Sequence, residues 1–365
     1  MKIDAAVFRD DTKQPSFEEL ELTGPQDGEV LVRLVATGVC HTDLKVAEGG
    51  IPIPRPVVLG HEGAGVVDAI GAGITKVKPG DHVVMTFASC GHCSSCLEAA
   101  PAYCHTVNHF LSQRPQGGHY LSAGGEPVHG DFFSQSSFAT YAIGVERSVV
   151  KVRQDAPLEM LGPMGCGFQT GAGAILNDFK IPPGKSLAIF GVGSLGLSAV
   201  MAGRIAGAGR IVVVDRHAHR LELAKELGAD DTIQAGTDPV APDLIELTSG
   251  GVDYALDTTG VGFVMRQAFV VLAPRGVCGY VTSPVESAEM SLPMRHFLGG
   301  RSIQGISEGG SNPDVFIPRL IDYYMDGRFP IDRLVKDYRF EQLGQAFEDS
   351  EAGLTIKPIL RFESI

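Results

Sequence analysis

From about residue 181, short apolar runs alternate with helical patterns, and this alternation limits the possible folds more than any other feature. LAIFGVG (187–193) and RIVVVD (210–215) predict two strands, and the segments 194–208 and 219–229 that follow them predict helices. Further strands are predicted in DTI, VDYALDTTG, GVCGYVT and SIQGI, with a helix in VMRQAFVVLA. Such alternation implies a parallel sheet covered by helices on both faces. We therefore expect a doubly wound α/β domain.

The turn between the first strand and the first helix has the glycine pattern G-V-G-S-L-G. The pattern spans residues 191–196, and its candidate cofactor-binding residues are Gly191, Gly193, Ser194, Leu195 and Gly196. In this position glycines let the backbone approach a pyrophosphate at the helix N-terminus. Asp215, which closes the next strand, can accept hydrogen bonds from the adenosine ribose and repels a 2′-phosphate. The pattern therefore predicts a dinucleotide site that favours NAD over NADP.

Three basic residues follow this acid and leave an alternative open. Arg216, His217 and Arg220 lie next to the expected ribose and could hold a 2′-phosphate. The other interpretation is a solvated helix start, which we prefer because of Asp215. Arg220 is also a candidate for the edge of the ribose.

The N-terminal part has a different pattern. The 365 residues exceed the ~250–300 at which one hydrophobic core stops growing, so two domains are expected. Residues 29–89 contain short β-rich runs separated by proline and glycine clusters. They predict a β-rich N-terminal domain, followed by an irregular segment at about 106–130.

Four of the seven cysteines lie within fifteen residues, in CGHCSSCLEAAPAYC. They are Cys90, Cys93, Cys96 and Cys104. Four thiolates at such spacing can enclose one tetrahedral Zn²⁺ with no open position, which makes the site structural. Two disulfides or an iron–sulfur cluster are the alternatives. His92 lies inside the loop, and we interpret it as a bystander because four thiols complete the shell.

Charge and the N-terminal residues restrict location and partners. The formal charge of -13 repels polyanions, so nucleic acid is not an expected partner. The start MKIDAAVFRDD has no apolar signal region, and we predict no transmembrane segment or membrane partner. A cytoplasmic location follows as an expectation, and clustered cysteines there more often bind metal than form disulfides.

A second set of soft ligands is dispersed along the chain. Cys40 in GVCHTD, His61 in LGHEGAG and Cys166 in MGCGFQTGAG are each set among glycines. Together they would form a Cys₂His zinc site whose fourth position is open to water or substrate. An open zinc beside a nicotinamide is suited to alcohol oxidation. The long spacings leave the simpler alternative of buried, unliganded cysteines open.

These motifs, in this order and at these intervals, resemble the zinc-dependent medium-chain alcohol dehydrogenases over essentially the whole chain. FFSQSSFATYA and LGPMGCGFQTGAG are most similar to bacterial aryl-alcohol (benzyl alcohol) and geraniol dehydrogenases. The resemblance implies a GroES-like catalytic domain at 1–167, to which 302–365 returns, and an NAD-binding Rossmann domain at 168–301. It also implies two zinc ions per chain, a cofactor cleft between the domains, and a homo-oligomer, either dimer or tetramer.

The same resemblance assigns roles around the dispersed metal site. It makes Cys40, His61 and Cys166 the catalytic zinc ligands and the thiol loop the structural site. Glu62 matches an acid behind the zinc that can approach it during ligand exchange. Asp43 matches the carboxylate that orients the histidine, and Thr42 the hydroxyl that takes the alcohol proton. Many members have a histidine where this chain has Lys45, so the proton relay beyond Thr42 is left unassigned.

For the cofactor, the resemblance assigns His41 and Lys357 to the pyrophosphate and Thr170 to a place beside the nicotinamide.

The remaining cysteine, Cys278, is expected inside a strand, with no functional role.

The expected reaction is oxidation of a primary aromatic or allylic alcohol to the aldehyde, by hydride transfer to the nicotinamide. Asn108 argues against the glutathione-dependent formaldehyde branch, which has a basic residue there. Four phenylalanines are candidates for an apolar substrate pocket or, equally, for plain core packing: Phe87, Phe110, Phe132 and Phe133. Aliphatic or secondary alcohols and polyols are the alternative substrates. A non-catalytic zinc- and nucleotide-binding protein is the alternative from another class.

Overall fold

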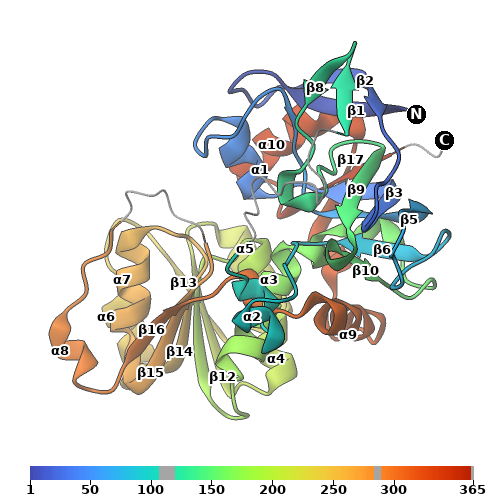
Figure 1. Cartoon of the computed structure of the whole chain (residues 1–365). Coiled ribbons are helices and arrows are strands. Elements are labelled where there is room, and N and C mark those ends of the chain that lie inside the picture. The colour runs from blue at the N-terminus through green and yellow to red at the C-terminus, as the bar shows by residue number, and fades with distance from the viewer. Residues whose placement is uncertain (107–119, 283–288, 363–365) are drawn as a thin grey trace. The chain divides into compact units, whose positions relative to one another are not determined.

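The computed structural model describes residues 1–106, 120–282 and 289–362. The chain divides into two compact units (Figure 1). Unit 1 comprises Met1–Cys166 and Asn312–Ile365, and unit 2 comprises Gly167–Ser311. Two residues named above, Asn108 and Phe110, lie outside the described residues. Across the described ranges, no helix is long and apolar enough to cross a membrane.

Unit 2 is built on a parallel sheet in the order β13-β12-β11-β14-β15-β16. The strands are β11 (Ser186–Phe190), β12 (Arg210–Asp215), β13 (Asp231–Gln234), β14 (Val252–Asp257), β15 (Leu272–Tyr280) and β16 (Ser302–Gly305). The order reverses between β11 and β14, which is the switch point where doubly wound folds bind their ligands. The predicted parallel sheet is confirmed, and Cys278 is buried within β15 as expected.

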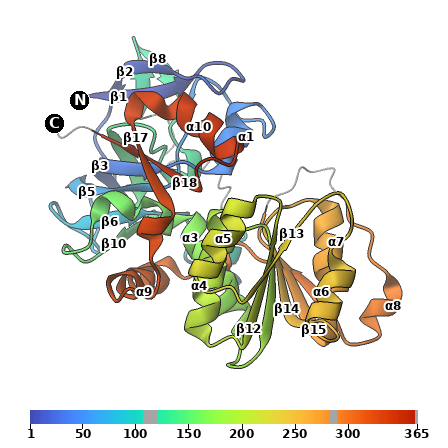
Figure 2. The ribbon, with the colours of Figure 1, turned by 180° about the vertical axis from the view of Figure 1, so that it is seen from behind.

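Helices cover both faces of this sheet (Figure 2). They are α3 (Gly167–Gly173), α4 (Ser194–Ala206), α5 (Ala218–Glu226), α6 (Ala241–Leu247), α7 (Gly262–Val270) and the short α8 (Met294–Phe297). Leu187 and Ile211 face α4 at Gly203, whereas Phe190 and Val212 point to the opposite face, which α6 and α7 cover. Because both faces are buried, the strands are continuous apolar runs rather than alternating ones.

Unit 1 contains two mainly antiparallel sheets. One has the order β4-β1-β2-β7-β8; the other has the order β10-β6-β5-β3-β18-β17, with β9 also paired to β3. The strands are β1 (Lys2–Phe8), β2 (Ser16–Leu22), β3 (Glu29–Gly38), β4 (Val57–Val58), β5 (Gly63–Ile70), β6 (His82–Met85), β7 (Leu121–Ala123), β8 (Glu126–Val128), β9 (Tyr141–Val145), β10 (Val149–Lys151), β17 (Val335–Arg339) and β18 (Lys357–Arg361). The helices are α1 (His41–Ala47), α2 (Ser94–Leu97), α9 (Pro313–Met325) and α10 (Leu343–Glu351). The prediction of a β-rich N-terminal part is confirmed.

The predicted irregular segment at 106–130 is wrong at its end. β7 and β8 form an antiparallel hairpin there, and β7 pairs with β2. The two residues of the turn, Gly124 and Gly125, both have positive φ, at 57° and 88°. A two-residue hairpin turn of this kind needs positive φ at both positions, which glycine provides without steric cost. The Gly-Gly pair was the signal in the sequence for this hairpin.

The predicted domain boundary at 301/302 also needs correction. β16 pairs in parallel with β15, from Ser302 opposite Val277 to Gly305 opposite Tyr280. These backbone hydrogen bonds place residues 302–311 in unit 2, and the chain returns to unit 1 at Asn312. There β18 pairs antiparallel with β3 and parallel with β17.

Gly196 in α4 allows a direct test of the turn after β11. A Cβ on Gly196 would overlap the carbonyl oxygen of Gly191, whereas a Cβ on Gly193 would meet only the Nη1 atom of Arg220, at 4.0 Å. We expect Gly196→Ala to lower the free energy of unfolding by about 2 kcal/mol or more, because the backbone must shift. Gly193→Ala, the matched control, should cost under about 1 kcal/mol. Urea denaturation measures both, and equal stabilities would contradict the assigned packing.

Candidate active site

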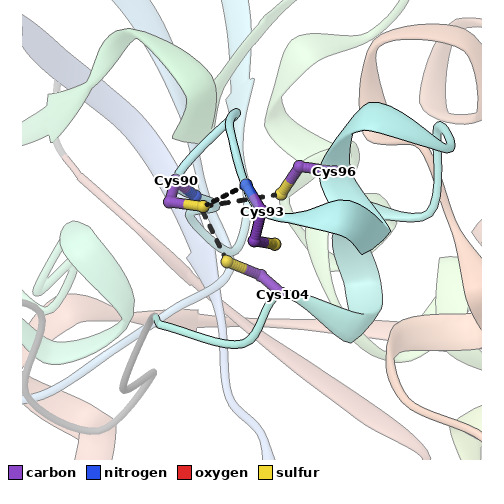
Figure 3. A group of neighbouring side chains, drawn as sticks. All are labelled: Cys90, Cys93, Cys96 and Cys104. Atoms are coloured by element: carbon purple, nitrogen blue, oxygen red, sulfur yellow. Dashed lines mark hydrogen bonds between the residues drawn. The ribbon is translucent and has the colours of Figure 1, made fainter.

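The four clustered cysteines converge in unit 1 (Figure 3). All are free thiols, and their four Sγ atoms lie within 4.8 Å of one another. Cys90 and Cys96 Sγ are 3.9 Å apart, and the Cys93 N–H donates to Cys90 Sγ at 3.3 Å. Four sulfurs at this spacing can surround one tetrahedral ion. His92 is not part of this four-cysteine cluster. Its ring is exposed, and its Nδ1 is hydrogen-bonded to the Cys90 carbonyl at 2.9 Å.

The protonation of this cluster favours a bound cation. A hydrogen bond from Thr106 is the main cause that lowers the pKa of Cys90 to about 5. Burial is the main cause that raises the pKa of Cys96 to about 11. Four neighbouring thiolates repel one another, so a cation is needed to keep all four ionised at neutral pH. The donor set therefore fits Zn²⁺, whose structural sites use four thiolates.

The dispersed trio also converges, and a fourth group joins it. The possible ligand atoms of Cys40, His61, Cys166 and Glu62 all lie within 4.8 Å of one another. Glu62 and His61 are buried, while the two cysteines are half-buried. All four residues belong to unit 1, although three separate segments of the chain supply them. The structure thus brings together the three predicted ligands and the predicted nearby acid.

Asp43 positions two of these ligands. Cys40 is the N-cap residue of α1, and its N–H donates to Asp43 Oδ2 at 2.9 Å. Asp43 Oδ1 accepts from the Gly60 N–H at 3.1 Å and from His61 Nδ1 at 2.8 Å. Gly60 has a φ of +91°, a conformation that favours glycine. One completely buried carboxylate therefore fixes the end of α1, the turn before His61 and the imidazole itself.

The His61 ring is prepared to bind a metal through Nε2. Because the Asp43 carboxylate can only accept, His61 Nδ1 donates to it, and Nε2 is the ring nitrogen that remains for a metal. Nε2 is buried and has no hydrogen-bond partner among the described residues. Cys40 adds a second donor, since a hydrogen bond with Cys166 is the main cause that holds the pKa of its thiol well below the ordinary value. An orphaned imidazole nitrogen beside two thiols fits a zinc ion.

Cys166 reaches this cluster through a tight turn. The 3₁₀ turn Gly162–Gly165 precedes it, and a Cβ on Gly162 or on Gly165 would overlap the carbonyl oxygens of Glu62 and Met85 respectively. Glycine at both positions lets this turn lie directly on the strands beside the other ligands.

Lys357 does not lie where the sequence analysis placed it. It is 2% exposed, and its Nζ donates to Glu62 Oε1 and Oε2 at 2.8 and 2.9 Å and to the Val39 carbonyl at 3.1 Å. Burial disfavours the charged amine, but the charges of Glu62 and of the two cysteines outweigh it and raise the pKa of Lys357. The predicted pyrophosphate contact is therefore replaced by a buried ion pair with Glu62.

The other predicted residues of α1 lie in its first turns. His41 is exposed, and Thr42 and Lys45 are half-buried. Thr42 follows Cys40 by two residues and lies in the first turn of α1.

Two aromatic rings pack against the His61 imidazole. The Phe133 ring is stacked on it at 4.4 Å between centroids and 22° between planes, and Phe132 meets it edge-on at 5.5 Å. Phe132 is completely buried, whereas Phe133 is 7% exposed. Phe87 belongs to the same hydrophobic cluster. All three rings thus lie in the core of unit 1, and Phe132 and Phe133 also lie against a candidate metal ligand.

Gln135, which was not among the predicted site residues, links the segment of these two rings to His61 and Gly63. Gln135 is buried, accepts from the Gly63 N–H at 3.1 Å and donates to the His61 carbonyl at 2.8 Å. Phe133 and its neighbour Ser134 have left-handed backbone conformations, with φ of 51° and 57°. Such strain persists only where surrounding contacts fix it, and it often marks functional sites. Apart from the polar run within FFSQSSF, no pattern in the sequence indicates this arrangement.

In unit 2 the glycine turn leaves space for a phosphate. Gly191 has a φ of +86°, and Gly193 is the N-cap of α4, where Ser194 and Leu195 begin the helix. The first N–H groups of a helix have no intrahelical acceptors. With no side chain on Gly193, a pyrophosphate can approach them, so the turn fits a dinucleotide.

Asp215 closes β12 and is tied to this turn. Its Oδ2 accepts from the Val192 N–H at 2.8 Å, and its Oδ1 accepts from the His217 N–H at 2.9 Å. A carboxylate has further lone pairs for ribose hydroxyls. Arg220 lies beside Gly193; its Nε is buried and has no hydrogen-bond partner in the described part of the chain. Burial is the main cause that lowers the pKa of Arg220.

Thr170 lies in α3 and therefore in unit 2. Its hydroxyl donates to Glu308 Oε2 at 3.3 Å. Glu308 follows the carboxyl end of β16, with a left-handed φ of 47°. Glu308 was not among the predicted site residues, although the neighbouring Gly309 and Gly310 indicate a tight turn there.

Comparisons with known proteins agree with this geometry. Residues 26–154 match the alcohol dehydrogenase GroES-like domain, and residues 194–322 match the zinc-binding dehydrogenase family. The chain is 44% identical over 364 residues to a geraniol dehydrogenase of Castellaniella defragrans, covering 98% of this chain and 97% of the relative.

Two solved structures are similar over almost the full length. An alcohol dehydrogenase zinc-binding domain protein from Burkholderia ambifaria is 47% identical, with a TM-score of 0.96 and complete coverage of both chains. A benzyl alcohol dehydrogenase from Acinetobacter calcoaceticus is 42% identical, with a TM-score of 0.95 and 99% coverage of both chains. With a Rossmann unit, a GroES-like unit and these relatives, the chain belongs to the zinc-dependent medium-chain alcohol dehydrogenase family.

Proposed function

We propose that this alcohol dehydrogenase oxidises primary aromatic or allylic alcohols to aldehydes, with NAD⁺ as the hydride acceptor and two zinc ions per chain. The observation that carries the proposal is the cluster of Cys40, His61 and Cys166, in which the buried Nε2 of His61 lacks a partner and an aromatic ring covers the imidazole. Three such ligands leave a fourth coordination position for the alcohol oxygen.

The residues around this cluster divide the chemical work. Zinc bound there would lower the pKa of an alcohol, as it lowers that of water from 15.7 to about 7. Asp43 holds the His61 tautomer that can bind the metal. Thr42 would take up the hydroxyl proton while passing its own proton on. NAD⁺ bound at the glycine turn would supply the hydride acceptor, so that the alcohol yields the aldehyde, NADH and a proton.

Support for the substrate class comes from relatives and from Phe133. The relatives named above include a geraniol dehydrogenase and a benzyl alcohol dehydrogenase, whose names refer to an allylic and an aromatic primary alcohol. The Phe133 ring lies parallel to the His61 ring, where it can contact a flat substrate near the metal. An aliphatic alcohol offers this ring less apolar contact surface. Aliphatic and secondary alcohols are therefore our second choice of substrate class.

The zinc assignment predicts two ions per chain, one for each cluster of ligands. Elemental analysis of Cys40→Ala should find only the zinc of the thiol loop, with turnover lost and NADH binding retained. Cys104→Ala should instead lose the loop zinc and thermal stability, because that site is closed and structural. Turnover in Cys40→Ala with both zinc ions present would refute the catalytic assignment.

The cofactor assignment predicts a higher kcat/KM with NAD⁺ than with NADP⁺. Asp215→Asn keeps one side-chain oxygen but removes the charge that repels a 2′-phosphate. The preference should narrow at least about tenfold, equivalent to about 1.4 kcal/mol of lost repulsion. Arg216→Ala is the control, since it should leave the wild-type preference unchanged if Arg216 is a solvated surface residue. A wild-type preference for NADP⁺ would contradict the assignment.

The substrate assignment predicts that benzyl alcohol and geraniol surpass ethanol, a secondary alcohol and S-hydroxymethylglutathione in kcat/KM. Phe133→Ala should reduce kcat/KM for benzyl alcohol about 10- to 100-fold while changing that for ethanol little, because apolar contacts of this size discriminate by about 1–3 kcal/mol. Phe133→Leu retains apolar bulk and separates the aromatic contact from simple filling. Equal losses for both alcohols would assign Phe133 to packing alone.

A further inference from the structure

The dispersed cluster contains one possible ligand more than an open zinc site needs. Glu62 offers a carboxylate oxygen within 4.8 Å of the donor atoms of Cys40, His61 and Cys166. Carboxylate oxygens bind zinc at distances similar to those of imidazole nitrogens. If Glu62 took the fourth corner, the site would have the closed shell of a structural zinc and no position for an alcohol.

The contacts of Glu62 show what holds it in place. Lys357 Nζ donates to both of its carboxylate oxygens, at 2.8 and 2.9 Å, and to the Val39 carbonyl at 3.1 Å. All three donors of the ammonium group are thereby used. The two charges are almost completely shielded from solvent, with exposures of 0% for Glu62 and 2% for Lys357. If Glu62 moved away from Lys357, a buried ammonium would be left without its counter-charge, which is strongly unfavourable.

The backbone fixes this ammonium beside the cluster. Lys357 begins β18, and β18 pairs antiparallel with β3, with Ile359 opposite Gly38. The Val39 N–H donates to the Pro358 carbonyl at 3.0 Å, one residue before Cys40. Gly38 contributes space, because a Cβ there would overlap Glu62 Oε2. Strand pairing and a missing side chain therefore place the carboxylate against the lysine.

We propose that Lys357 is a positioning residue that retains Glu62 as its ion-pair partner and so keeps the fourth coordination position of the zinc open for the alcohol. The inference rests on the proposed catalytic zinc and deepens it. It assigns to Lys357 a function on the metal side of the site in place of the pyrophosphate contact expected from the sequence.

The test uses the holoenzyme with Co²⁺ at the catalytic site, because the visible bands of cobalt respond to its ligands. Imidazole is the probe for an open position. In the wild type, imidazole should shift the bands. In Lys357→Met, Glu62 should occupy the position, change the resting spectrum and weaken imidazole binding at least about tenfold, the low end of effects seen when a partner of a metal ligand is removed.

Two further variants separate this role from a general structural one. Lys357→Met combined with Glu62→Gln removes both charges, and Lys357→Arg keeps the cation. Both should restore the wild-type spectrum and imidazole affinity. Lys357→Gln keeps one hydrogen bond to Glu62, and the same weakening is expected from it if Lys357→Met does not fold.

One outcome would refute the positioning role of Lys357, and another would refute the open metal site itself. If the folded single variants bind imidazole as the wild type does, with an unchanged cobalt spectrum, Lys357 has no positioning role while the catalytic metal stands. If wild-type cobalt enzyme shows no response to imidazole at all, the open metal site itself is refuted, and the proposed function fails with it.

Discussion

The Asp43 carboxylate lies at the N-terminus of α1, completely buried, and accepts hydrogen bonds from the Cys40 and Gly60 backbone amides and from the His61 ring. One side chain therefore caps a helix, closes a turn and selects the tautomer of an imidazole. A buried carboxylate is tolerated only when such donors compensate its desolvation. If one of these donors were lost, the buried negative charge of Asp43 would be less well compensated. The capping of α1 and the orientation of His61 therefore depend on each other.

Close backbone approach is the second requirement of the site. Gly38, Gly162 and Gly165 each lie where a Cβ would overlap a neighbouring segment, and two of these overlaps would be with Glu62. The turn before Cys166 can lie on the strands, and Glu62 can lie against Lys357, only because these side chains are absent. Part of the high glycine content, 46 residues, thus serves the assembly of one metal cluster.

The two metal clusters differ in how the chain builds them. Cys90, Cys93, Cys96 and Cys104 come from one loop, so their convergence depends on local turns such as Gly91, with its φ of +79°. The other cluster draws on three segments and needs the complete sheet of unit 1 to bring them together. The first is therefore suited to a closed structural site, whereas the second can be arranged by the fold to leave a position open.

The sequence alone determined those features whose cause is local. The alternation of strands and helices after residue 181, the glycine turn followed by Asp215, and the spacing of the four thiols each reflect periodicity or short-range geometry that the order of residues records directly. The ligand trio was also predicted, with the help of a family resemblance.

Only the tertiary structure decided the rest. Lys357 was assigned to the pyrophosphate from the family resemblance, but the pairing of β18 with β3 buries it against Glu62. Likewise, β16 joins unit 2 through hydrogen bonds to β15, and Gln135 reaches both Gly63 and His61 from far along the chain. These contacts join residues that are distant in sequence, and no local pattern specifies which buried charge or amide will meet which partner until the sheets have formed.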